Sequence, residues 1–242
     1  MKFLISVVTE AEAILALKKP IDILDVKNPK EGSLGANFPR VTKRIVTLCK
    51  ETNPQVVISA TLGNWHYAPG SATLAAYGLA YCGVDCIKVG LHQISTTEQA
   101  FQMMSEIVEA IKSVDEKILV VASGYAECKK ISSINYDELI HASMDSKVDI
   151  VMLDTAIKNG KTLLDSLSVD ELNDFVKKAH GLGMRAALAG SLDYESIHTL
   201  YNLKNKPDIL GIRGLICSSS DRNQELDSVK LDEFLNKSAQ LI

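Results

Sequence analysis

Eight short apolar runs recur along the chain, and each is followed by a segment with helical spacing. The runs predict strands at residues 3–8, 21–26, 56–60, 84–89, 118–122, 149–153, 184–188 and 209–212. A continuous apolar run of this length is typical of a strand covered on both faces. The intervening patterns predict helices near residues 10–18, 39–48, 71–81, 101–111, 136–144, 168–180, 197–203 and from about 229 onward.

Strands and helices alternate strictly, in units of about thirty residues that suit a strand and its crossover helix. Eight such units predict an α/β fold, the (β/α)8 TIM barrel, as a single domain over residues 1–242. The competing architecture is a doubly wound open sheet. That fold usually has fewer strands and a glycine-rich phosphate loop after the first, whereas Thr9-Glu10-Ala11 follows here.

Composition narrows the function classes. A net charge of −4 excludes general electrostatic binding of nucleic acid. No apolar run approaches the roughly 18 residues of a membrane helix, and the N-terminal run is too short for a signal peptide. The five cysteines lack C-x-x-C spacing and the five histidines lack ligand spacing. We therefore expect a cytoplasmic protein with reduced thiols and no metal.

Charged residues gather where the predicted strands end. Strand two ends with Asp25 and Lys27, strand four with Lys88, and strand six with Asp154, followed four residues later by Lys158. Barrel enzymes keep their chemistry at the C-terminal ends of the strands. Residues two apart share a face of a strand, so these side chains are expected to meet in one mouth.

Clustered lysines suggest amine chemistry. Neighbouring cations and an apolar pocket lower the pKa of a lysine, so that its neutral amine attacks a carbonyl and forms a Schiff base. We expect Lys27 to be this nucleophile, Asp25 to position it, and a second lysine to move protons. The alternative is a structural ion pair of Asp25 and Lys27 that closes the strand.

Two small turns follow strands seven and eight, at Gly190-Ser191 and Arg213-Gly214. Barrels commonly build a phosphate site from backbone N–H groups at this position. These four residues are therefore candidates for substrate and phosphate binding. The alternative is that the glycines only fit tight turns.

Other residues carry weaker predictions. Trp65 and His66 fall in a loop on the active face, as substrate contacts or as a packed anchor. Cys86 shares the face of Lys88 but has no histidine to activate it, so we expect a core residue. The segment 123–125 is a possible pocket wall. Lys30, Lys161 and Arg222 are expected to be solvated or to steer phosphate.

Several motifs together resemble the (5-formylfuran-3-yl)methyl phosphate synthase family, also called 4-(hydroxymethyl)-2-furancarboxaldehyde-phosphate synthase. They are Asp25-Val26-Lys27-Asn28-Pro29-Lys30-Glu31-Gly32-Ser33-Leu34-Gly35, the stretch 84–91, Met152-Leu153-Asp154-Thr155-Ala156 with Lys158, the stretch 187–192, and Gly211-Ile212-Arg213-Gly214. The likeness runs over essentially the whole chain.

The resemblance implies a (β/α)8 barrel that condenses two molecules of glyceraldehyde 3-phosphate, with loss of phosphate and water. The product is the furan precursor of methanofuran. It implies Lys27 as the Schiff-base lysine and Lys88 as the proton acceptor. Asp25, Asp154 and Lys158 match further functional positions of the family. No cofactor is expected, and the partner is a phosphorylated triose.

Two other functions remain open on the sequence. One is a class I aldolase that uses the same lysines on another sugar phosphate. The other is a non-catalytic sugar-phosphate-binding barrel, whose lysines would titrate near the ordinary value of about 10.4. The sequence leaves a homo-oligomer possible, because barrels often associate.

Overall fold

The fold is a closed barrel of eight parallel strands. The computed structural model describes residues 1–239, and its strands pair in the order β1 to β8 before β8 closes on β1. The strands are β1 (Lys2–Val7), β2 (Ile23–Val26), β3 (Val57–Trp65), β4 (Cys86–Leu91), β5 (Leu119–Tyr125), β6 (Ile150–Asp154), β7 (Arg185–Leu188) and β8 (Ile209–Ile212). The predicted (β/α)8 architecture is confirmed.

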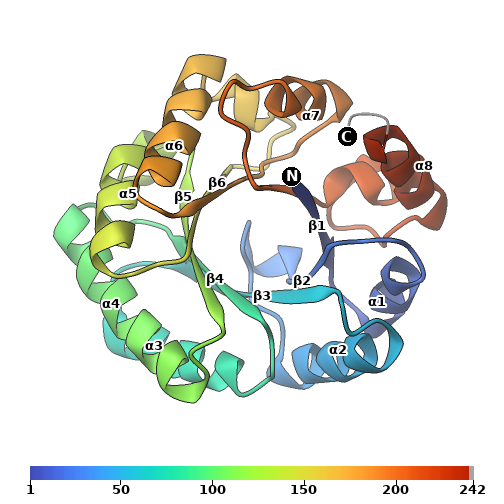
Figure 1. The fold of residues 1–242 in the computed structure, drawn as a ribbon, viewed down its shortest axis with the longest axis horizontal. Coiled ribbons are helices and arrows are strands. Elements are labelled where there is room, and N and C mark those ends of the chain that lie inside the picture. The colour runs from blue at the N-terminus through green and yellow to red at the C-terminus, as the bar shows by residue number, and fades with distance from the viewer. Residues whose placement is uncertain (240–242) are drawn as a thin grey trace.

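Among residues 1–239, eight α-helices form a ring around the barrel (Figure 1). They are α1 (Glu10–Leu17), α2 (Pro39–Thr52), α3 (Pro69–Ala80), α4 (Thr97–Val114), α5 (Tyr136–Asp145), α6 (Val169–Gly181), α7 (Tyr194–Tyr201) and α8 (Ser228–Ala239). The predicted end of the last helix, beyond residue 239, lies outside the described residues. In the described part of the chain, no helix is long and apolar enough to cross a membrane.

Strand β3 is longer than the sequence predicted. Residues 61–65 were expected in a loop, but they extend the strand and pair with β4, with Trp65 opposite Leu91. The register shifts between Thr61 and Asn64, which is an irregularity of the β-bulge type. Asn64 and Trp65 are therefore held by strand pairing at the C-terminal end of β3.

The barrel strands separate two cores. Alternate residues such as Ile5 and Leu24 face the helices and belong to the large outer core. The other residues face the barrel axis and form a smaller inner cluster, made of Leu4, Ile23, Cys86, Val121, Ile150, Met152, Ala187, Ala189 and Ile209. Two residues further along three of these strands come Asp25, Lys88 and Asp154, all buried. The predicted shared faces are therefore correct.

Candidate active site

A cavity of about 390 Å³ opens at the C-terminal mouth of the barrel. Its charged lining comes from five separate strands or the loops that follow them: Lys27, Lys88, Asp154, Lys158, Asp193, Arg213, Asp221 and Arg222. Gly190, Ser191 and Gly214 also line it. The structure therefore brings the strand-end residues Lys27, Lys88, Asp154 and Lys158 to one mouth as predicted, whereas Asp25 is not part of the lining.

Asp25 and Lys88 form a buried ion pair inside the barrel. Lys88 Nζ lies 2.7 Å from Asp25 Oδ2, and the side chains are 1% and 0% exposed. Ser6 Oγ donates a hydrogen bond of 3.0 Å to the same oxygen. Asp25 Oδ1 has no hydrogen-bond partner among residues 1–239, so it keeps a free acceptor. Asp25 was expected to pair with Lys27, and its ion-pair partner is Lys88 instead.

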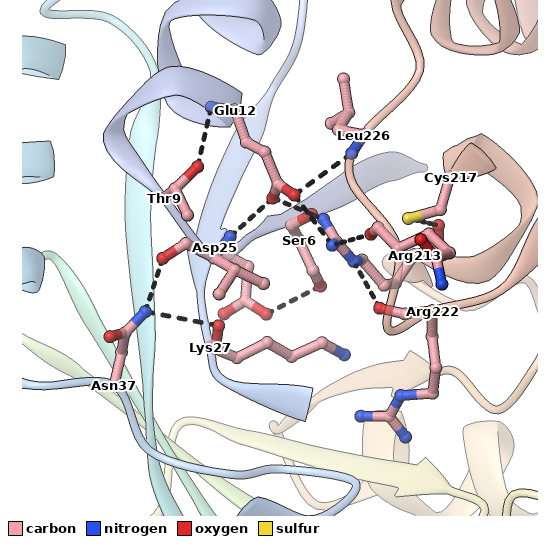
Figure 2. Close-up of polar contacts among 12 residues, drawn as sticks. Ser6, Thr9, Glu12, Asp25, Lys27, Asn37, Arg213, Cys217, Arg222 and Leu226 are labelled. Atoms are coloured by element: carbon pink, nitrogen blue, oxygen red, sulfur yellow. Dashed lines mark hydrogen bonds and ion pairs between the residues drawn. The ribbon is translucent and has the colours of Figure 1, made fainter. Parts of the chain in front are cut away.

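Lys27 stands just beyond the end of β2, where its backbone N–H donates to Val7 O at 3.0 Å. The side chain is nearly buried and lines the cavity beside Asp25 (Figure 2). Burial and the nearby positive charge of Lys88 lower the pKa of Lys27 from 10.5 to about 7, against the opposing effect of Asp154. Near neutral pH, a large fraction of this amine is therefore uncharged and nucleophilic.

Asp154 ends β6 and holds Lys158 from the following loop. Lys158 Nζ donates to Asp154 Oδ1 and to Thr155 Oγ1, each at 2.8 Å. The loop is not helical, so the spacing of four residues does not come from a helical turn. Burial would raise the pKa of Asp154, but Lys158 and Lys27 outweigh it and the pKa is lowered. Asp154 is thus a carboxylate at neutral pH.

The guanidinium of Arg213 is fully engaged in structural contacts. It forms two bonds with the buried carboxylate of Glu12, Nη1 to Oε2 at 2.6 Å and Nη2 to Oε1 at 3.0 Å. Its other donors reach the backbone carbonyls of Ser6 and Arg222 (Figure 2) and that of Gln224. Because a guanidinium has five N–H donors, none remains for phosphate. The Arg213 side chain is therefore structural, whereas the backbone phosphate site predicted at Arg213-Gly214 stays a prediction.

Glu12 is the residue that sequence reasoning missed. Its carboxylate also accepts from the backbone N–H groups of Val8, at 2.7 Å, and Leu226, at 3.2 Å. It therefore ties α1 to the loop after β8 from the centre of a buried network. The available signal was an acidic residue within the apolar run Ala11–Leu17, because a buried charge needs a partner.

Arg222, which was expected to be solvated or to steer phosphate, bridges two loops at the mouth. Its Nη2 donates to the carbonyls of Gly32 and Ser33, at 2.9 and 3.3 Å, so it joins the loop after β8 to the loop after β2. Its Nε has no hydrogen-bond partner in the part of the chain that the structure describes, although the side chain lines the cavity. An arginine with unused donors at a cavity wall is suited to an oxyanion.

The two glycines of the predicted phosphate turns differ. Gly190 has a φ of +122°, and a Cβ there would come within 2.8 Å of Thr155 Cγ2. The backbone of Gly190 and Ser191 therefore fits only with glycine at position 190. Gly214 has no such constraint, since the nearest atom to a Cβ would lie at 3.5 Å. Gly190 is therefore required by the tight turn, and it also lines the cavity, so both interpretations of this glycine apply.

Comparison with known proteins identifies the family. Residues 3–235 match the family model described as 4-HFC-P synthase. Two curated relatives named (5-formylfuran-3-yl)methyl phosphate synthase come from Archaeoglobus fulgidus and Methanosarcina barkeri. They are 46% and 44% identical over 90% and 92% of this chain, and the matches cover 91% and 93% of those proteins. The chain belongs to the 4-HFC-P synthase family.

This family membership confirms the resemblance drawn from the motifs, and it makes the chain a member of a family of enzymes. Solved structures agree on the fold. The tetrameric deoxyribose phosphate aldolase from Aeropyrum pernix superposes with a TM-score of 0.64 at 15% identity, covering 97% of this chain and 89% of that one. An aldolase called QR15 gives 0.63 at 11% identity, covering 98% and 96%. At these identities the likeness shows the barrel alone.

The structure also places the residues of this family member that carried weaker predictions. Trp65 is an anchor: its indole N–H donates to Leu62 O at 3.1 Å, and its ring packs on the outer core. His66 is exposed and does not line the cavity. Cys86 is a core residue of the inner cluster, as predicted. Lys30 and Lys161 are exposed, and neither lines the cavity.

The segment 123–125 is buried but does not line the cavity. Tyr125 instead donates from its hydroxyl to Asn64 Oδ1 at 2.7 Å, and Leu34 N donates to the same oxygen at 3.1 Å. Asn64 thereby links Tyr125 at the end of β5 to Leu34 in the loop after β2. Within residues 1–239, no group of three histidine, cysteine or acidic side chains lies close enough to hold a metal ion.

Proposed function

We propose that this protein is a (5-formylfuran-3-yl)methyl phosphate synthase that joins two molecules of glyceraldehyde 3-phosphate through a Schiff base on Lys27. Two observations support the substrate and mechanism. The curated relatives bear this enzyme name over nine-tenths of the chain. The observation that carries the proposal is the amine of Lys27, nearly buried at the cavity wall with its pKa lowered to about 7.

Lys27 begins the reaction in this proposal. Its neutral amine attacks the aldehyde carbon of the first triose phosphate, the new C–N bond forms, and the carbonyl oxygen leaves as water. The resulting iminium withdraws electrons from the neighbouring carbon, which can then lose a proton. A lysine whose pKa stayed near 10.4 would be almost entirely protonated at pH 7 and could not start this step.

Lys88 and Asp25 then serve as the acid–base pair. Asp25 Oδ1 is an unused acceptor, and Lys88 Nζ shares the other oxygen across 2.7 Å. The pair takes the proton from the substrate carbon next to the iminium, which leaves an enamine. The activated triose then forms the new carbon–carbon bond to the second triose. Release of one phosphate and two water molecules, together with cleavage of the C–N bond that frees Lys27, completes the aromatic furan ring.

Two cationic side chains of the cavity keep donors for phosphate. Lys88 is paired with Asp25 and Arg213 with Glu12. Lys158 uses two of its three ammonium donors, and Arg222 has an unbonded Nε among the described residues, so both can bind a phosphate group. We assign Asp154 to holding Lys158 over the cavity, and Lys158, Arg222 and the backbone of Gly190-Ser191 to phosphate binding.

Borohydride trapping tests the proposal. The protein is incubated with glyceraldehyde 3-phosphate, reduced with sodium borohydride, and digested for mass spectrometry. The expected result is a covalent adduct on the peptide containing Lys27, absent from Lys27→Arg, together with phosphate release and furan-aldehyde absorbance in the unreduced sample. A Lys27→Ala variant that keeps full activity, or an adduct confined to Lys88, would overturn the assignment of the nucleophile.

The same experiment separates the other functions. A class I aldolase acting on another sugar phosphate would give the adduct on Lys27 without phosphate release. A non-catalytic binding barrel would give neither adduct nor product, although the substrate would still protect Lys27 from modification. The lowered pKa of Lys27 favours the catalytic functions, because binding an anion requires a charged lysine.

A further inference from the structure

A second cavity, also of about 390 Å³, opens at the opposite, N-terminal end of the barrel. TIM-barrel interiors are normally filled by layers of bulky side chains. In this barrel, small residues replace them in the lower layers: Ser59 on β3, Cys86 on β4 and Ala187 on β7 all line the cavity. The volume falls within the range of small-molecule sites, which is about 300–1,000 Å³.

The wall of this cavity is apolar apart from Ser59 and Lys88. It is formed mainly by the inner cluster, with Ile23, Val121 and Ile150 among its members. Burial raises the pKa of the Cys86 thiol to about 12, so the thiol stays neutral. Ser59 Oγ is buried at this wall and has no hydrogen-bond partner among residues 1–239. The wall therefore favours an apolar body and leaves one hydroxyl group unused.

The rim of the cavity is cationic. Lys2, Arg185 and Lys206 line it and are exposed, and Asp208 is the one acidic residue of the lining. The carboxylate of Asp208 already accepts from the backbone N–H of Ala186 and contacts His180 Nε2, each at 2.8 Å. Arg185 forms no ion pair in the described residues. Positive charge thus surrounds the entrance to an apolar chamber.

We propose that the N-terminal cavity is a binding site for an anionic amphiphile of the medium-chain carboxylate class. The hydrocarbon chain lies inside the barrel against the inner cluster. The carboxylate lies at the rim, between Arg185 and the neighbouring lysines. The hydrophobic wall supplies most of the affinity, and the rim fixes the orientation.

This site is separate from the catalytic mouth and does not depend on the proposed reaction. Lys88, Met152 and Leu4 line both cavities and form the partition between them. The ammonium group of Lys88 is paired with Asp25. A ligand below the partition therefore meets the methylene stem of Lys88, which is apolar.

Isothermal titration calorimetry with octanoate tests the proposal. We expect saturable binding of one octanoate per chain, with a negative heat-capacity change because apolar surface is buried. Arg185→Glu reverses a rim charge on an exposed residue and is expected to weaken binding roughly tenfold. Ala187→Leu fills the chamber and is expected to abolish binding. Arg40→Glu, an equal charge change on the exposed start of α2, is the matched control and should bind as the wild type does.

Competition with inorganic phosphate separates this site from the lysines of the catalytic mouth. Octanoate in the N-terminal cavity is expected to remain bound when phosphate is present. The proposal is overturned if octanoate does not bind, or if phosphate displaces it while Arg185→Glu and Ala187→Leu bind normally. Since Arg185 is exposed, its variant remains informative even if Ala187→Leu fails to fold.

Discussion

Lys88 Nζ lies 2.7 Å from Asp25 Oδ2, and both side chains are inside the barrel with almost no contact with solvent. Removing one charge of such a pair leaves the other buried and uncompensated. We expect Asp25→Asn to lower the free energy of unfolding by about 3–5 kcal/mol. Urea denaturation followed by circular dichroism measures this change.

The matched control for this prediction is the exposed pair of Asp137 and Lys178, whose side chains are 49% and 43% accessible. Asp137→Asn is expected to change stability by about 1 kcal/mol or less, since surface ion pairs contribute little. Equal losses in the two variants would mean that burial of the Asp25–Lys88 pair has no energetic consequence.

The second prediction concerns the titration of Lys27. Its amine has a pKa of about 7, so acetylation by acetic anhydride should accelerate as pH rises through neutrality and level off above. Lys88 lowers this pKa, so Lys88→Met is expected to move the midpoint to higher pH. Asp154 raises it, so Asp154→Asn is expected to move the midpoint to lower pH. Peptide mass spectrometry quantifies the label at residue 27.

Shifts in the same direction in both variants would contradict this account of the pKa. Labelling of exposed Lys43 provides the internal reference in every sample. Its rate should have the same pH dependence in the wild type and in both variants. The proposed reaction should follow the same curve, with kcat/KM falling on the acid side as Lys27 becomes protonated.

The third prediction is that Lys27 reduces stability. The folded-state pKa of about 7 lies below the ordinary value of 10.5, so the unfolded chain binds more protons between these two pH values. The contribution of Lys27 to stability therefore improves as pH rises through this window. Lys27→Met is expected to stabilise the protein at pH 7 by about 1–4 kcal/mol. The advantage should shrink toward pH 10.

Denaturant titrations of wild type and Lys27→Met at pH 6, 7, 8.5 and 10 check this prediction. Lys43→Met, at an exposed position, is the control and should show a difference from wild type that does not vary with pH. A stability difference for Lys27→Met that is constant or grows with pH would show that Lys27 is not held with a lowered pKa.

The fourth prediction separates the two arginines at the mouth. Both Nη atoms of Arg213 donate to the buried carboxylate of Glu12. Because Arg213→Met leaves this carboxylate uncompensated, the variant is expected to lose about 3–5 kcal/mol of stability. Arg222 has donors to spare, so Arg222→Gln is expected to raise the KM for the phosphorylated substrate roughly tenfold, as for a lost charged hydrogen bond. Steady-state kinetics and thermal unfolding of both variants provide the measurements.

A double variant, Glu12→Leu with Arg213→Met, removes both buried charges and is expected to recover part of the lost stability. If it folds, its KM should stay near that of the wild type. A large rise in KM in the double variant, with none in Arg222→Gln, would assign phosphate binding to the Arg213 side chain instead of Arg222.

The fifth prediction compares two glycines of the phosphate turns. Gly190→Ala places a Cβ within 2.8 Å of Thr155 Cγ2 at a φ of +122°, and is expected to cost about 1–3 kcal/mol. Gly214→Ala meets no atom closer than 3.5 Å and is expected to change stability by about 0.5 kcal/mol or less. Thermal unfolding of the pair checks this contrast, and equal effects would contradict it.

The sequence by itself determined the fold and the location of the mouth. Buried strands have a period of two and the helices a period of 3.6, so apolar spacing was sufficient to count eight units. The same period put Asp25 and Lys88 on inward faces, and the position of the strand ends put Asp154 and Lys158 beside them. Strand β3 was predicted too short. The polar residues at positions 61 and 64 suggested a loop, but both pair with β4.

Tertiary structure alone decided which charges pair. Residues from alternate strands share a layer inside a TIM barrel, so Asp25 on β2 meets Lys88 on β4, while Lys27 lies beyond the strand end. Likewise, closure of the barrel brings Glu12 on α1 to Arg213 after β8, 201 positions away in the chain. Side-chain spacing along a sequence fixes the face on which a residue lies. Strand tilt and barrel closure fix its neighbour, and neither is written in local periodicity.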